Sequence, residues 1–122
     1  MAGRARKGWV LTRPSIIKIG PEKFEISFRD PGQDGMLNDG NYGYTLDAGN
    51  LIVISNSISL PKQRVTLMHE VLHAARMIFE KTTPNKESDY EDWEHHFIGL
   101  YETTLVMIMR DNPTIVEWIQ KD

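Results

Sequence analysis

Apolar and polar residues alternate along the first third of the chain with the two-residue period of β-strands. In the segment KFEISFR, Phe24, Ile26 and Phe28 fall on one side. Two shorter segments before it, GWVLT and SIIKIG, contain several β-branched residues. We therefore expect three short strands, at residues 8–12, 15–20 and 23–29.

A segment rich in glycine, aspartate and asparagine follows at residues 30–43, and we expect it to form a loop. The strand pattern then resumes on both sides of the sequence DAGN at 47–50. Glycine and asparagine tolerate the backbone angles of tight turns, so residues 42–55 predict a β-hairpin whose second strand is 51–55.

The apolar period changes at Pro61, a residue that suits the first turn of a helix. From there, apolar residues recur every three or four positions, at Val65, Met68, Leu72, Ala75 and Phe79. This spacing predicts a helix that ends before the polar segment TTPNKES at 82–88.

A second helix is expected to begin at Ser88, because Glu91 follows it at the spacing of a capping box. Asn112 and Pro113 would end this helix, and Pro113 would open a short last helix over 113–120. The apolar stripe of the second helix holds four residues, Ile98, Tyr101, Leu105 and Ile108.

Strands followed by helices indicate an α+β domain. We expect a small antiparallel β-sheet, then two long antiparallel helices and a short C-terminal helix. The 122 residues suffice for one compact domain with one core. Within it we expect a disordered tail at 1–8, the sheet at 9–55 and the helical part, with the metal site, at 61–121.

The composition narrows the range of functions. The net charge is −3, from 17 acidic and 14 basic residues, which argues against nonspecific nucleic-acid binding. Cysteine is absent, which excludes disulfides, thiolate nucleophiles and cysteine–zinc sites. We see neither a secretory leader nor an apolar run long enough to cross a bilayer, so we expect a cytoplasmic protein without a membrane partner.

The sequence TLMHEVLHAARM carries the strongest candidate chemistry, because it holds two histidines four residues apart with a glutamate directly after the first. Residues at i and i+4 lie on one helix face, so His69 and His73 can direct their imidazoles at a common point. Imidazole binds Zn²⁺ readily, and catalytic zinc sites use three protein ligands and a water. Glu70 lies about 100° around the helix from His69, where it can act as general base on that water.

The position of the histidines around the helix is also compatible with a solvated pair. With His69 at 0°, the apolar residues of this helix occupy an arc from about 160° to 300°, and His73 falls at about 40°. That placement beside the buried stripe suits ligands on a cleft wall and equally suits exposed side chains. The zinc hypothesis therefore rests on the motif.

A third ligand is expected from the second helix if the two helices run antiparallel across the short connection. Equal distances from the connection place three residues opposite His73, namely Glu94, His95 and His96. All three side chains can bind zinc. Glu94 lies on the apolar stripe, His95 lies beside it and His96 points further away. Alternatively, the three residues belong to the polar half of an exposed helix.

The segment YGYTLDAGNLIVISNSISLPKQRVTLMHEVLHA resembles the core of the small ImmA/IrrE-type zinc metallopeptidases of bacteria and their phages. The shared pattern is a glycine-containing turn, an I-x-I strand, a polar connection and a T-L-x-H-E-x-x-H helix. The matching residues are Gly43, Ile52, Ile54, Thr66, Leu67, His69, Glu70 and His73. Phage-type members continue to a D-N-P ending, here within RDNP at 110–113, so the resemblance covers roughly residues 42–120.

The resemblance implies a gluzincin-like minimal fold and a zinc-dependent metalloendopeptidase that hydrolyses a protein, often a regulator, in the cytoplasm of a bacterium or of a phage host. His69 and His73 would bind Zn²⁺, and Glu70 would be the catalytic base. Counting back from the D-N-P ending places the family's acidic ligand at His95, where this chain departs from the pattern. The count and the position beside the stripe favour His95 as third ligand, with Glu94 as the alternative.

Catalysis would need two more features. The first is a donor for the oxyanion, and four side chains qualify by residue type, Tyr42, Tyr44, Tyr101 and Arg76. The second is a place for the substrate backbone. If strand 51–55 lies at an edge of the sheet, it can hold an extended peptide by strand addition.

The rival hypothesis is a binding module that keeps the zincin fold, with structural or vestigial zinc, and acts by blocking a host or phage protein. A chain of 122 residues has little room for a second lobe around a substrate, which favours this rival. A DNA-binding regulator is disfavoured by the acidic balance and by the lack of a recognisable recognition helix. The substrate, the oligomeric state and turnover itself are left open.

Overall fold

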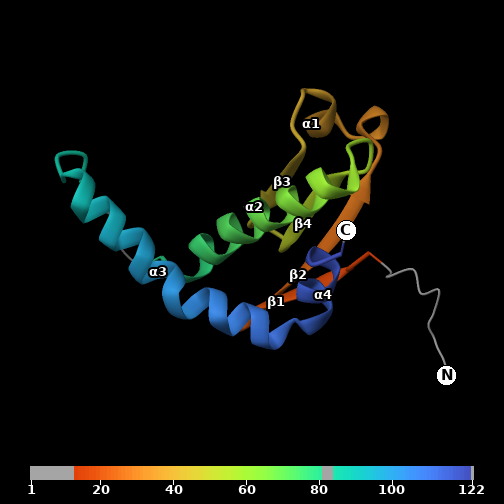
Figure 1. Cartoon of the computed structure of the whole chain (residues 1–122). Coiled ribbons are helices and arrows are strands. Elements are labelled where there is room, and N and C mark those ends of the chain that lie inside the picture. The colour runs from red at the N-terminus through yellow and green to blue at the C-terminus, as the bar shows by residue number, and fades with distance from the viewer. Residues whose placement is uncertain (1–12, 81–83, 122) are drawn as a thin grey trace, which may run out of the picture.

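The computed structural model describes residues 13–80 and 84–121. The expected strand at 8–12 and the tail at 1–8 lie outside these residues. Figure 1 shows a sheet followed by helices, the mixed α and β architecture expected from the sequence. The elements are β1 (Ile16–Ile19), β2 (Glu22–Arg29), η1 (Pro31–Gln33), α1 (Gly35–Asn38), β3 (Gly43–Leu46), β4 (Leu51–Ser55), α2 (Leu60–Phe79), α3 (Tyr90–Asp111) and α4 (Pro113–Ile119).

The described strands form one sheet in the order β1-β2-β4-β3. The outer pairs, β1 with β2 and β3 with β4, are antiparallel, but the central pair of β2 and β4 is parallel. The expectation of an antiparallel sheet was therefore wrong for its centre. The chain crosses from β2 through η1 and α1 into the predicted hairpin, and the second strand of that hairpin, not the first, pairs with β2.

This order also decides between the edge and internal positions considered for strand 51–55. Strand β4 is internal, because β2 and β3 flank it, and β3 forms the edge. The hairpin between them is confirmed. Its turn carries Gly49 and Asn50 at positive φ angles of 92° and 50°. The segment predicted as a loop at 30–43 contains two short helices, η1 and α1. Asp34 is the N-cap residue of α1.

The core lies between one face of the sheet and the helices. Helix α2 packs over β3 and β4, and α3 packs over β1. The helices contribute Leu67, Val71, Ala74, Ala75, Ile108, Ile115 and Trp118 to the core, and the sheet contributes Ile17, Ile19, Phe24, Ile26, Ile52 and Ile54. None of the described helices has the length and apolarity needed to cross a bilayer.

Helix α2 is turned differently from its predicted orientation. Val65, one of the apolar residues that set the helical period, is 72% exposed, whereas Leu67, Val71 and Ala74 are buried. The apolar arc of this helix is wider than its contact with the sheet, so the pattern alone could not tell which part would be covered. The rotation brings Glu70 into the interface between α2 and the sheet.

Helix α3 starts at Tyr90, and its N-cap is Asp89 rather than Ser88, since the Asp89 side chain accepts a hydrogen bond from the amide of Asp92. Its second half packs, with Ile108 buried, but Ile98 of the predicted stripe is 53% exposed. A helix of 22 residues is about 33 Å long. Its first turns therefore extend beyond the sheet and α2 (Figure 1).

Candidate metal centre

The two histidines of the motif lie together on α2. Nε2 of His69 is 3.1 Å from Nε2 of His73. Two nitrogen ligands at ordinary distances from a tetrahedral zinc are separated by about 3.3 Å, so the pair fits two positions of a zinc site. The same separation suits an N–H···N hydrogen bond between neutral imidazoles. The His69 side chain is 66% exposed, and a metal can therefore approach from solvent.

Glu70 is held between α2 and β3, with only 5% of its surface exposed. The hydroxyl of Thr45 donates a hydrogen bond to Glu70 Oε1 over 2.7 Å. The other carboxylate oxygen, Oε2, lies 3.9 Å from Nε2 of His69. The carboxylate thus has one oxygen fixed by the sheet and one directed toward the histidine pair.

Gly43 allows β3 to approach α2 this closely. A Cβ atom at this position would lie 2.8 Å from Cγ2 of Thr66 and 2.8 Å from the carbonyl oxygen of Val53. Both contacts are shorter than side chains tolerate, so a larger residue would push the edge strand away from the helix. Gly43, which belongs to the motif pattern, therefore has a packing role here.

A cleft of about 360 Å³ opens between the first half of α2 and the segment leading into β3. It is lined by Gly40, Asn41, Tyr42, Gly43, Val65, Thr66, His69 and Glu70. The histidine and the carboxylate thus face a hollow that is large enough for a short stretch of polypeptide.

Within the described sheet, the edge strand beside this cleft has backbone groups that pair with no other strand. The amide of Ser55 donates to the carbonyl of Tyr42 over 2.8 Å, which makes this pair a hydrogen-bonded pair of the β3–β4 ladder. In an antiparallel ladder such pairs alternate, so Tyr44 bonds toward β4 while the backbone groups of Gly43 and Thr45 point to the outer side of the strand. That outer side is an edge of the described sheet.

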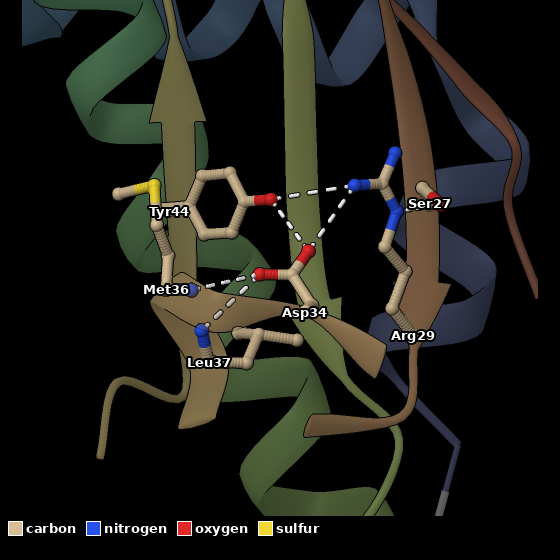
Figure 2. Close-up of polar contacts among 6 residues, drawn as sticks. All are labelled: Ser27, Arg29, Asp34, Met36, Leu37 and Tyr44. Atoms are coloured by element: carbon tan, nitrogen blue, oxygen red, sulfur yellow. Dashed lines mark hydrogen bonds and ion pairs between the residues drawn. The ribbon is translucent and has the colours of Figure 1, made fainter. Parts of the chain in front are cut away.

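The opposite face of the sheet carries a polar network that anchors the segment before β3. Figure 2 shows Tyr44 and Arg29 pointing toward one another across β4, with Asp34 between them. The Asp34 carboxylate accepts hydrogen bonds from the Tyr44 hydroxyl at 2.7 Å and from Arg29 at 3.2 Å. Its other oxygen accepts from the amides of Met36 and Leu37 in α1. The network therefore ties α1, which precedes the cleft, to the sheet.

The hydrogen bonds of this network shift two pKa values in opposite directions. The hydrogen bond from Tyr44 is the largest cause that lowers the pKa of Asp34, and the Leu37 amide and Arg29 act in the same direction. Burial, followed by the bond to Asp34, raises the pKa of Tyr44. Both shifts favour an ionised Asp34 and a neutral, hydrogen-donating Tyr44.

The structure does not bring the expected third ligand to the histidine pair. Glu94 and His95 lie on the projecting part of α3 and are exposed. Across the described residues, no three histidine, aspartate or glutamate side chains converge on a point that could hold a metal. The helices cross near Leu72 and Tyr101, since the Tyr101 hydroxyl donates to the Leu72 carbonyl over 3.1 Å. This register places residues 94–95 beyond the histidines.

His96, the least favoured of the three candidates, has a structural partner. Its Nε2 lies 2.8 Å from Oε2 of Glu80, whose other oxygen accepts from Arg76 at 2.8 Å. The bond from His96 is the largest cause that lowers the pKa of Glu80, followed by the bond from Arg76. The cluster joins the end of α2 to α3.

Of the four residues considered as oxyanion donors, only Tyr42 lines the cleft. Tyr44 points to the opposite face, Tyr101 donates to Leu72, and Arg76 pairs with Glu80. Sequence reasoning missed Thr45, the hydrogen-bond donor to Glu70. Strand alternation could have found it, because Thr45 shares a face with Gly43 in the predicted hairpin.

Comparisons of the chain with protein-family models, with curated proteins and with solved structures returned no match. The zinc hypothesis therefore rests on the motif and on the geometry of His69, Glu70 and His73.

Proposed function

We propose that this protein is a zinc-dependent metalloendopeptidase in which His69 and His73 bind Zn²⁺ and Glu70 is the catalytic base. The observation that carries the proposal is the His69–His73 nitrogen separation of 3.1 Å next to a buried carboxylate. Two imidazoles and an adjacent carboxylate at the wall of an open cleft would supply two of the three zinc ligands and the general base that zinc-dependent hydrolysis of a peptide bond uses.

Zinc at this position would supply Lewis-acid activation of water and of a peptide carbonyl. Glu70 would accept the proton from the attacking water at Oε2, because Oε1 is occupied by the Thr45 hydroxyl. It would then deliver that proton to the leaving amine. Burial holds the carboxylate in one orientation, which reduces the reorganisation needed in the transition state.

The substrate would be an extended protein or peptide segment that lies along the outer side of β3. The free backbone groups of Gly43 and Thr45 can pair with such a segment, as extended peptides add to sheet edges in other proteins. Tyr42 in the same cleft is the candidate donor to the oxyanion. We place the activity in the cytoplasm, following the resemblance and the lack of cysteine.

The proposed third ligand is His95, with Glu94 as the alternative. Either residue can reach the histidine pair only if α3 shifts along α2 by more than one turn, because the contact of Tyr101 with Leu72 places residues 94–95 opposite the end of α2. The separation of these residues from the pair supports a second candidate function. A module that binds a host or phage protein, without hydrolysis, would need neither a third ligand nor a general base.

The two functions are distinguished by Glu70→Gln, which preserves the shape of the side chain and removes its basicity. For an enzyme, the variant should keep the zinc content of the wild type and lose hydrolysis of a denatured protein substrate. Glu102→Gln is a matched control, since Glu102 is exposed on α3. Wild-type hydrolysis by Glu70→Gln would remove the enzyme proposal, whereas inactive wild-type protein that still binds its cellular partner would favour the module.

A further inference from the structure

The rotation of α2 leaves part of its apolar arc outside the core. This uncovered part forms the floor of a second hollow, an open groove of about 740 Å³ between α2 and the end of α4. The groove is lined by Pro61, Arg64, Val65, Met68, His69, Leu72, Ile119 and Lys121. His69 and Val65 also line the cleft that contains Glu70, so the two hollows meet at the candidate metal centre.

Arg64 stands out in this groove because it is a largely buried cation that has no carboxylate partner among the described residues. The residue is only 8% exposed. Its Nε donates to the carbonyl of Trp118 over 2.9 Å, and its guanidinium carbon lies 5.3 Å from the centre of the Trp118 ring. These two contacts fix the plane of the guanidinium. Within the described residues its Nη atoms, which carry four N–H donors, form no hydrogen bond.

The Nη atoms of Arg64 are not among the buried unsatisfied atoms of the described residues, so they reach the solvent of the groove and can bind a ligand there. Among the described residues that line the groove no side chain is acidic, and a second cation, Lys121, is also among them. The groove is therefore apolar along its floor and positively charged at a fixed point. A carboxylate attached to an apolar segment matches both properties, because it can accept two parallel N–H bonds from a guanidinium.

We propose that the groove is a substrate subsite that binds an acidic side chain, Asp or Glu, next to an apolar residue of the peptide. This inference rests on the proposed function, since it assigns the specificity of the same site. Arg64 is a binding residue in this assignment, and Val65, Met68 and Leu72 contact the apolar neighbour.

The length of the groove favours an acidic side chain inside a peptide, rather than the carboxylate of a chain terminus, as the ligand of Arg64. The lining residues of α2 extend from Pro61 to Leu72, about 16 Å along the helix axis and enough for about five extended residues. Arg64 lies inside this length, so a peptide can continue past it. It lies about 7.5 Å along the axis from His69, which places the acidic residue about two positions from the bond to be cleaved.

The test is binding of a blocked peptide to the full chain in the presence of a chelator. The probe is acetyl-Ala-Leu-Ala-Glu-Ala-amide, and its counterpart carries Gln in place of Glu. We expect the Glu peptide to bind about tenfold more tightly, because only the carboxylate forms charge-assisted bonds. Equal affinity of the two peptides would overturn the subsite.

Two variants localise the binding. Arg64→Gln should remove the preference for Glu, and circular dichroism shows whether it folds. Val65→Glu adds a negative charge at a position that is 72% exposed, so the variant should fold. Its charge repels the carboxylate of the Glu peptide, so it should lower the affinity for that peptide about tenfold. Val106→Glu, at an exposed site on α3 outside the groove, is the matched control. If Val65→Glu and Val106→Glu lowered the affinity for the Glu peptide equally, the assignment would be overturned.

Two competitors identify the source of the carboxylate. Acetyl-Ala-Leu with a free C-terminal carboxylate and octanoate are each tested against the Glu peptide. Tighter binding of either competitor than of the Glu peptide would overturn the choice of an internal acidic side chain. Binding is measured without zinc and without turnover, so failure of hydrolysis leaves the subsite standing, and loss of the Glu preference leaves the peptidase standing.

Discussion

The hydroxyl of Thr45 lies 2.7 Å from Oε1 of Glu70 and connects the edge strand to the helix that carries both histidines. A hydroxyl has one hydrogen to donate, so the carbonyl oxygen of Glu70, 3.2 Å away, cannot be a second acceptor of full strength. The bond therefore serves the carboxylate. It fixes which oxygen of Glu70 is available for chemistry.

Replacing Thr45 by valine should test this role, because valine has nearly the same shape and no donor. Glu70 is buried, and an unsatisfied buried acceptor costs about 1–3 kcal/mol of unfolding free energy. Thr45→Ser keeps the hydroxyl and should lose much less. Urea titration of the two variants measures the difference. Equal stabilities would mean that Glu70 is satisfied by water instead.

Gly43→Ala should separate β3 from α2. The added Cβ would meet Thr66 and the Val53 carbonyl at 2.8 Å, and overpacking of this kind costs about 1–3 kcal/mol. The variant should lose stability and, for an enzyme, more activity than Thr45→Ser. Gly99→Ala is the control, since no heavy atom lies within 4 Å of a Cβ added there. It should stabilise α3 by about 1 kcal/mol in thermal unfolding. If Gly43→Ala and Gly99→Ala both lowered stability, the loss in Gly43→Ala could not be attributed to the contact between β3 and α2.

Local features of the fold were predictable from the sequence. The DAGN turn set the β3–β4 hairpin because Gly49 and Asn50 can adopt positive φ angles. The start of α2 was found to within a residue from Pro61, and the last helix was found from Pro113. In each case residues adjacent in sequence determine the structure.

Longer-range features were not predictable. The sequences of β2 and β4 do not determine that the two strands pair in parallel, since that pairing depends on the path of the connection between them. The third-ligand prediction assumed a symmetric hairpin of helices about the connection. The bond from Tyr101 to Leu72 instead sets a crossing point near the middle of α3. One helix face can be read from a pattern, but the register between two helices depends on contacts along both.

The network on the far face of the sheet predicts a dependence of stability on acid. The pKa of Asp34 is lowered in the folded state, so its ionised form contributes stability above its ordinary value of 3.8, and that contribution is lost as the pH falls through the folded pKa. Tyr44→Phe removes the largest cause of the shift.

In Tyr44→Phe the folded pKa of Asp34 should rise toward 3.8, and the loss of stability on acidification should become smaller. Urea titrations between about pH 2 and pH 6 measure this difference. Tyr42→Phe is the control, because Tyr42 lies in the cleft on the other side of the segment. An unchanged acid dependence in Tyr44→Phe would show that Arg29 and the α1 amides are sufficient to hold Asp34 ionised.

The zinc hypothesis predicts that the chain binds about one zinc ion, with an affinity that depends on His69 and His73. Alanine at either position should weaken binding at least about tenfold, as measured by competition with a chelating dye. His95→Ala should weaken binding more than His96→Ala, and His96→Ala should instead loosen the contact with Glu80. If Glu94→Ala is the damaging change, the register argument was wrong by one residue.

Zinc binding through His95 requires α3 to shift along α2 so that its first turns pack beside the histidines, and this movement can be measured directly. Amide hydrogen exchange over residues 90–98 should slow when zinc is added to the wild type. It should not slow in His95→Ala. If zinc leaves these amides unchanged, and neither His95→Ala nor Glu94→Ala alters affinity, α3 supplies no ligand. The histidine pair would then hold metal with two protein ligands, an arrangement that fits a binding module better than a peptidase, because catalytic zinc sites use three.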